Sequence, residues 1–142
     1  MDRQPFQQRA IAAATGIAAG RAWLYLQPDL RIVERRAKSV LSEVELLESA
    51  VAASIEELTE LREQVRASLG ESSAGIIRAQ QTIAEDESIM QEIVDLIRDE
   101  MMCAEGAVAR VFEGYRGLFE AMPEDAYNRA RMSDVEDVSR RI

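Results

Sequence analysis

A long apolar stripe at helical spacing is the feature that most constrains how this chain folds. Between Arg31 and Leu69 apolar residues recur mostly in steps of three and four, and no glycine or proline interrupts them. This spacing places them along one side of a helix, which must pack against other helices to bury that side. The positions are Val33, Ala37, Val40, Val44, Leu47, Val51, Ile55, Leu58, Leu61, Val65 and Leu69. We therefore expect one long helix over residues 31–69.

Glycine and clustered charge predict where the following helices end and begin. Gly70 stands where the C-terminus of a helix favours glycine, and Ser72 or Ser73 is expected to cap the next helix. The charged segment AEDES, residues 84–88, predicts a break or a kink near Asp86. Apolar residues at helical spacing lie on both sides of it, namely Ile76, Ile77 and Ile83 before it and Ile89, Ile93, Leu96 and Ile97 after it.

Two more helices are expected in the rest of the chain. A regular stripe runs from Cys103 to Met122, and a last helix is predicted from Ala126 to Ile142, after Pro123. The stripe consists of Ala104, Val108, Val111, Tyr115, Leu118 and Met122, and Phe112 and Phe119 widen it. Four or five helices with short connections predict a mainly α fold, a helical bundle.

The segment AATGIAAGRAWLYL, residues 13–26, differs from the rest of the chain. It has two glycines four residues apart, small apolar residues between them and a run of large apolar residues after them. This pattern indicates a short strand and a tight turn rather than a helix.

Composition limits the classes of partner and of cellular location. With 142 residues, 47% of them hydrophobic and 30% charged, the chain suits one folded domain. A net charge of −9 argues against nucleic acid as a partner. No apolar run approaches the roughly 20 residues that span a bilayer, so we expect no contact with a membrane. The single cysteine, Cys103, excludes an internal disulfide and is compatible with a cytoplasmic location.

The chain contains no histidine, which excludes the commonest kinds of active site. It can hold no histidine general base, no histidine metal ligand and no phosphohistidine. Neighbouring carboxylates such as Glu56 and Glu57 point apart on a helix. The acidic triplet at residues 85–87 lacks the ligand spacing of a calcium loop. We therefore expect no catalytic residue, no metal site and no cofactor in this chain.

Charge is unevenly distributed along the sequence. Residues 71–100 carry a net charge of −6, which can steer a basic partner toward the chain or can simply form a solvated outer face. In the last predicted helix, Arg131, Asp134 and Asp137 follow one another at steps of three on a partly apolar side. We expect them to form structural ion pairs, with partners on facing helices.

Four segments, taken in order, resemble one known family. TGIAAGRAWLYL is similar to the opening SPGIAIGKAFL of the phosphoenolpyruvate-protein phosphotransferases, enzyme I of the bacterial sugar phosphotransferase system. AEDESIMQEIVDLIRDE (84–100), CAEGAVARVFEGYRGLFEAM (103–122) and RARMSDVEDVSRRI (129–142) resemble later segments of the same family. The similarity is collinear and extends over nearly the whole chain from about Thr15.

The resemblance implies a function in docking rather than in catalysis. Residues 1–30 would contribute a strand to a separate phosphohistidine domain that is not in this chain. Residues 31–142 would form the helical domain that docks HPr, a small carrier that is phosphorylated on histidine. Mg²⁺ and phosphoenolpyruvate would bind a later barrel domain, which is also not in this chain. The implied role is to position HPr for phosphoryl transfer from that phosphohistidine.

The resemblance also implies which residues face HPr, although the match is incomplete. They are Glu71, Ser72, Gly75, Arg78, Thr82, Ser88 and Ile89. The family often has acidic residues at the positions of Ser72, Arg78 and Ser88, and a histidine at the position of Gln80. HPr offers basic and apolar groups around its histidine, so Arg78 is unfavourable there and the acidic helix is favourable.

Two other functions fit the same residues. A non-catalytic helical bundle would act as an oligomerisation or adaptor module, and an unpaired opening strand would favour a homodimer. The chain also fits the enzyme I-like segment of a dihydroxyacetone kinase phosphotransferase subunit.

Overall fold

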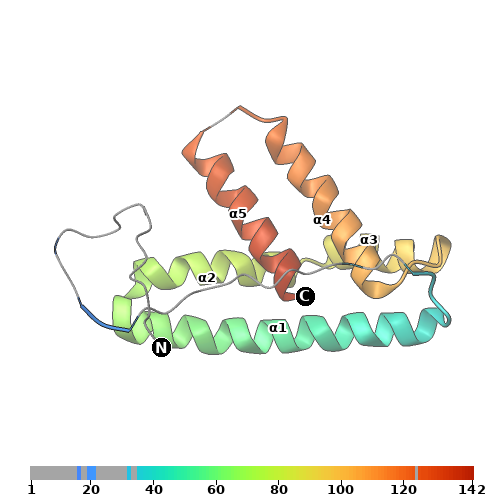
Figure 1. Ribbon diagram of the computed structural model, residues 1–142, viewed down its shortest axis with the longest axis horizontal. Coiled ribbons are helices and arrows are strands. Elements are labelled where there is room, and N and C mark those ends of the chain that lie inside the picture. The colour runs from blue at the N-terminus through green and yellow to red at the C-terminus, as the bar shows by residue number, and fades with distance from the viewer. Residues whose placement is uncertain (1–15, 17–18, 22–31, 33–34, 124) are drawn as a thin grey trace, which may run out of the picture.

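The computed structural model describes residues 16, 19–21, 32, 35–123 and 125–142, and this part of the chain is a bundle of five helices (Figure 1). They are α1 (Val40–Leu69), α2 (Glu71–Ala84), α3 (Glu87–Asp99), α4 (Ala104–Glu120) and α5 (Ala126–Arg141). The predicted mainly α bundle is thus confirmed. The predicted opening strand lies outside the described residues, except that Gly16, Ala19, Gly20 and Arg21 are described and form no strand.

One long helix provides the surface on which the others assemble. α1 has 30 residues, which corresponds to a length of about 45 Å. α2 runs back along α1, and α3 continues in the same general direction after a break (Figure 1). α4 and α5 form an antiparallel hairpin that crosses this layer and projects beyond it (Figure 1). The hairpin contacts α1, α2 and α3 near its open end.

α1 begins nine residues later than the apolar pattern predicts, so the predicted helix over 31–39 is wrong in its described part. Ser39 is the N-cap, and its Oγ accepts a hydrogen bond from the Ser42 N–H at 3.3 Å. The backbone before it is bonded to another segment instead: the Ala37 N–H donates to the Met101 carbonyl at 2.7 Å, and the Cys103 N–H donates to the Arg35 carbonyl at 3.2 Å. These contacts join residues 35–37 to residues 101–103 in an isolated antiparallel bridge between Arg36 and Met102.

The predicted boundaries after α1 are confirmed at two positions and wrong at a third. Gly70 ends α1 with a φ of +86°, a conformation that glycine adopts without strain. Asp86 separates α2 from α3 and caps α3 by accepting hydrogen bonds from the Ser88 and Ile89 N–H groups. The prediction that Ser72 or Ser73 caps α2 is wrong, because α2 already begins at Glu71 and both serines lie within its first turn.

The core lies where the five helices meet. Leu58, Ile93 and Ile97 have no exposed surface, and the buried cluster around them includes Leu47, Ala84, Ile89, Ala104, Ala107, Val108, Val111, Phe112, Val135 and Val138. The ends of the predicted stripes are not buried. Leu69, Leu118 and Met122 are 70%, 59% and 47% exposed.

Among the residues that the structure describes, no helix combines the length and the apolar composition that crossing a membrane requires.

Candidate docking site

Four of the seven predicted docking residues line a single groove on the surface. Gly75, Arg78 and Thr82 come from α2, and Ile89 comes from the start of α3. The groove has a volume of about 460 Å³, and its other lining residues are Ala79, Ile83, Tyr115, Phe119, Arg131 and Val135. The surface therefore combines one side of α2 and the first turn of α3 with the inner sides of the α4–α5 hairpin.

The other three predicted residues are exposed and lie outside the lining of this groove. Glu71 and Ser72 are at the start of α2, and Ser88 is in the first turn of α3. Glu71 lines a smaller hollow of about 180 Å³ beside the groove, together with Arg62, Glu63, Arg66, Ala74, Gly75 and Arg78. Arg78 thus lies between the two depressions.

Hydrogen bonds fix α2 against its neighbours on the side away from solvent. Gln80 is buried, and its Nε2 donates to Oδ2 of Asp137 on α5 at 3.1 Å. Gln81 donates to the Thr59 Oγ1 at 3.0 Å and accepts a hydrogen bond from Arg62 at 3.0 Å, both on α1. Gln80, where the resembling family often has histidine, therefore serves here to join α2 to α5.

One buried carboxylate lies behind the groove. Asp134 is 9% exposed, and its Oδ2 accepts a hydrogen bond from Arg131 at 3.3 Å. The Arg131 guanidinium also lies over the Tyr127 ring, 5.3 Å from its centre. Burial raises the pKa of Asp134, Arg131 lowers it in part, and Asp137 raises it further. The partner of Asp134 is thus on its own helix, whereas that of Asp137 is on α2.

We expect the Asp134→Asn variant to be at least as stable as the natural chain at pH 7, by up to about 1 kcal/mol. The variant removes a charge that burial disfavours and keeps an oxygen that can accept from Arg131. Because the pKa of Asp134 is raised in the folded state, the folded chain takes up a proton at a higher pH than the unfolded chain, and the resulting gain in stability is complete below the ordinary aspartate pKa of about 3.9. The advantage of the variant should therefore shrink as the pH falls from 7 to 4 in urea unfolding. A larger stability advantage of the variant at pH 4 than at pH 7 would contradict a raised pKa of Asp134 in the folded state.

Two aromatic residues of the predicted apolar stripe pack against the core and also line the groove. Tyr115 and Phe119 follow the apolar stripe of α4, and the structure shows them half-buried along the groove. The Tyr115 hydroxyl donates to Oε1 of Glu92 on α3 at 3.1 Å, and burial together with this carboxylate raises the pKa of Tyr115. The helical spacing indicated their side of α4 correctly, but it contains no information on how far the facing helices extend.

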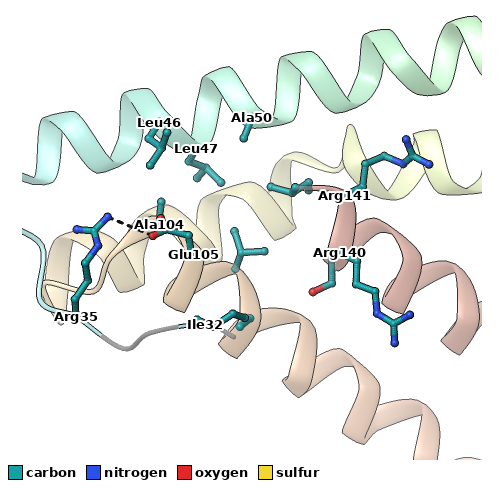
Figure 2. A pocket seen from close by; sticks show the side chains of 13 residues that line it. Ile32, Arg35, Leu46, Leu47, Ala50, Ala104, Glu105, Arg140 and Arg141 are labelled. Carbon is teal, nitrogen blue, oxygen red and sulfur yellow. Dashed lines mark hydrogen bonds and ion pairs between the residues drawn. The ribbon is translucent and has the colours of Figure 1, made fainter. Parts of the chain in front are cut away.

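A second cleft, of about 520 Å³, lies between α1, the first turns of α4 and the end of α5 (Figure 2). Leu46 and Ala50 of α1 face Ala104 of α4 across it, and Arg140 and Arg141 lie at its α5 end (Figure 2). Arg35 contacts Glu105 at 3.4 Å at the opposite end. No predicted docking residue lines this cleft, so the groove beside α2 is the candidate site.

The chemistry of the groove suits binding rather than catalysis. Its lining has no carboxylate, cysteine or histidine, and its two charged residues are both arginines. Within the described ranges, no three residues of metal-ligating type come together as a possible metal site. A groove of apolar side chains with charged groups at its edge is typical of a surface that receives another protein.

Comparisons with known proteins identify the relatives of this chain. Residues 9–131 match the family model described as PEP-utilising enzyme, N-terminal. The chain is 36% identical over 134 residues to the phosphoenolpyruvate-protein phosphotransferase of Enterococcus faecalis, and the match covers 94% of this chain and 23% of that protein. It is 37% identical over 136 residues to the protein of the same name from Mycoplasma capricolum, where it covers 96% and 24%. The chain thus spans about a quarter of the length of these relatives.

Solved structures have the same fold. An NMR structure of an Enzyme I protein (nEIt) superposes with a TM-score of 0.75 at 24% identity, covering 80% of this chain and 46% of that one. The N-terminal domain of a nitrogen Enzyme 1 superposes with a TM-score of 0.70 at 21% identity, covering 78% and 45%. At sequence identities this low, the two superpositions show a shared fold and carry no conclusion about function.

Proposed function

Because this chain belongs to the family of N-terminal domains of PEP-utilising enzymes, we propose that it docks the phosphocarrier HPr in the groove beside α2. Docked there, HPr would be held for phosphoryl transfer from a phosphohistidine on a domain outside this chain, in the cytoplasm. The observation that carries the proposal is the gathering of Gly75, Arg78, Thr82 and Ile89, spread over fifteen residues of sequence, along one groove.

The contribution of this chain to the reaction would be positioning. The helices hold the groove rigidly through the buried core and through the Gln80–Asp137 bond, and fixed orientation of two reacting groups is itself a large part of catalysis. We also propose that Mg²⁺ and phosphoenolpyruvate bind a domain outside this chain, as the resemblance implies.

The test is an NMR titration of isotope-labelled chain with HPr from the same organism. We expect chemical-shift changes to be largest between Glu71 and Ile89 and at Phe119, and small at the cleft shown in Figure 2. Changes centred on Leu46 and Ala50 instead would place the partner on the other side of the molecule. No change at millimolar HPr would overturn the proposal.

Gly75→Gln should separate docking from stability. A Cβ atom at this position meets no atom within 4 Å, so a side chain there has room to project into the groove that Gly75 lines. Glutamine is a better helix former than glycine, so α2 should gain about 0.5 kcal/mol of stability, while HPr binding should weaken at least about tenfold through steric overlap.

Gly117→Gln is the matched control for this variant. Gly117 also lies within a helix and also has open space around it, but it does not line the groove. It should raise stability by a similar amount and leave HPr binding unchanged. Equal effects of the two variants on binding, measured by calorimetry, would show that the groove is not the contact surface.

A further inference from the structure

Arg78 lines the groove without an ion pair in the described part of the chain, although Glu63 and Glu71 line the smaller hollow beside it. The side chain of Arg78 makes no hydrogen bond and no ion pair with any described residue, although it is at the edge of both the groove and the smaller hollow. The second arginine of the groove differs, because Arg131 is bonded to Asp134 and stacks on Tyr127.

The surroundings of Arg78 inside the groove are apolar. Ile83, Ile89, Phe119 and Val135 line it, and no carboxylate does. A partner that covers this surface removes water from the Arg78 guanidinium, and an unpaired charge that loses its water costs free energy. Binding is therefore more favourable for a partner that supplies a negative charge at this point.

We propose that the partner presents an apolar surface with a carboxylate side chain that pairs with Arg78. This inference rests on the proposed docking of HPr and states the chemistry of the contact. It also departs from the contact that the resemblance implies, in which an acidic residue of the domain meets a basic residue of the carrier. At Arg78 the signs are reversed, because the domain presents the positive charge and the carrier presents the negative one.

The reversal of charge concerns a single contact, and it is compatible with the net negative charge of the whole chain. The net charge of −9 still attracts a partner that is basic overall, because long-range steering depends on total charge. Close contacts depend on individual side chains, and there a like charge costs several kcal/mol while an opposite charge is favourable. A basic carrier with one acidic residue in its contact surface satisfies both conditions.

The experiment compares HPr binding by the unsubstituted chain with binding by Arg78→Glu, Arg78→Gln and Lys38→Glu. Lys38 is exposed, makes no ion pair with the described residues and stands before α1, away from the groove, so its variant is a control for the same change in net charge. We expect Arg78→Glu to weaken binding at least about tenfold, Arg78→Gln about threefold and Lys38→Glu less than about twofold. Circular dichroism checks that each variant is folded.

A charge exchange in the partner completes the test. HPr spectra recorded with the unsubstituted chain and with Arg78→Glu identify the acidic HPr residue whose NMR signal differs most between the two complexes. Replacing that residue by lysine should restore binding to Arg78→Glu. Unchanged or tighter binding by Arg78→Glu would overturn the inference and leave the proposed docking intact, because the partner would then present no carboxylate there. If HPr does not bind the unsubstituted chain, the proposed docking fails, and this inference fails with it.

Discussion

Ile93→Ala should lower the free energy of unfolding by about 3–4 kcal/mol, the largest loss that we expect from a single substitution in this chain. Ile93 has no exposed surface and lies in the middle of α3, one turn from Ile89 and one turn from Ile97. The side chain fills the space between α3 and the helices on either side of it. Truncation removes buried apolar surface and leaves a cavity that the rigid neighbours fill only in part.

Urea unfolding followed by circular dichroism gives this free energy directly. Ile93→Val should cost about 1 kcal/mol, because it removes a single methylene from the same site. Ile76→Ala is the exposed control: Ile76 is 60% exposed on α2, so the change should stay within about 0.5 kcal/mol. A loss below 1 kcal/mol for Ile93→Ala would mean that the core at α3 collapses around the cavity and is loosely packed.

The same substitution should also affect docking, since α3 is what places Ile89 at the groove. Ile89 and Ile93 are four residues apart and share the buried side of α3. A cavity at Ile93 allows the first turn of α3 to shift, and this turn contributes to the lining of the groove. HPr binding measured below the unfolding transition therefore reports whether the position of α3, and not its helical content alone, determines the site.

Much of this fold follows from local sequence signals. The stripe of α1 predicted Leu47 and Leu58 as buried, Gly70 predicted the end of that helix, and Asp86 predicted the break between α2 and α3. Each of these depends on interactions within a few residues, namely helical periodicity, a positive φ and a side chain that caps.

Apart from the capping serine predicted for α2, the wrong predictions concern interactions between distant segments. The apolar pattern before Val40 continues the helical period, yet residues 35–37 bond to residues 101–103, more than sixty positions away. Helical spacing also cannot indicate how much of a stripe the facing helices cover, so it does not distinguish the exposed Leu118 from Tyr115, which lines the groove. The positions of Gly75, Arg78, Thr82 and Ile89 came from the resemblance, because composition and periodicity indicate no site there.

Glu43→Gln should lower the free energy of unfolding by about 2 kcal/mol at pH 7. Glu43 is only 6% exposed although it lies in the first turn of α1. Its carboxylate accepts two hydrogen bonds from Arg35, one of them at 3.1 Å, and a third from the Ala104 N–H at 2.9 Å. Ala104 is the first residue of α4, whose own N-cap, Cys103, makes no side-chain capping bond. Glu43 thus caps α4 from α1 and holds the segment before α1 at the same time.

Glutamine cannot replace this carboxylate, because one of its two terminal groups is a donor. Its amide oxygen can accept a hydrogen bond from Ala104 or from Arg35. Its amide NH₂ group, itself a donor, then faces the other of these two donors and forms no hydrogen bond with it. Glu45→Gln is the matched control, since Glu45 is exposed, is two residues away on the same helix and makes no ion pair with the described residues. It should change stability by less than about 0.5 kcal/mol.

The pH dependence distinguishes an ionic contact at Glu43 from simple packing. The hydrogen bonds from Arg35, followed by the one from Ala104, lower the pKa of Glu43 in the folded state. The carboxylate therefore stabilises the fold fully above the ordinary glutamate pKa of about 4.3, and this contribution is lost as the pH falls through the lower folded value. The difference in stability between the natural chain and Glu43→Gln should accordingly shrink between pH 5 and pH 2. A difference that stays constant over that range would show that Glu43 contributes through its shape, and that α4 is held in place without its charge.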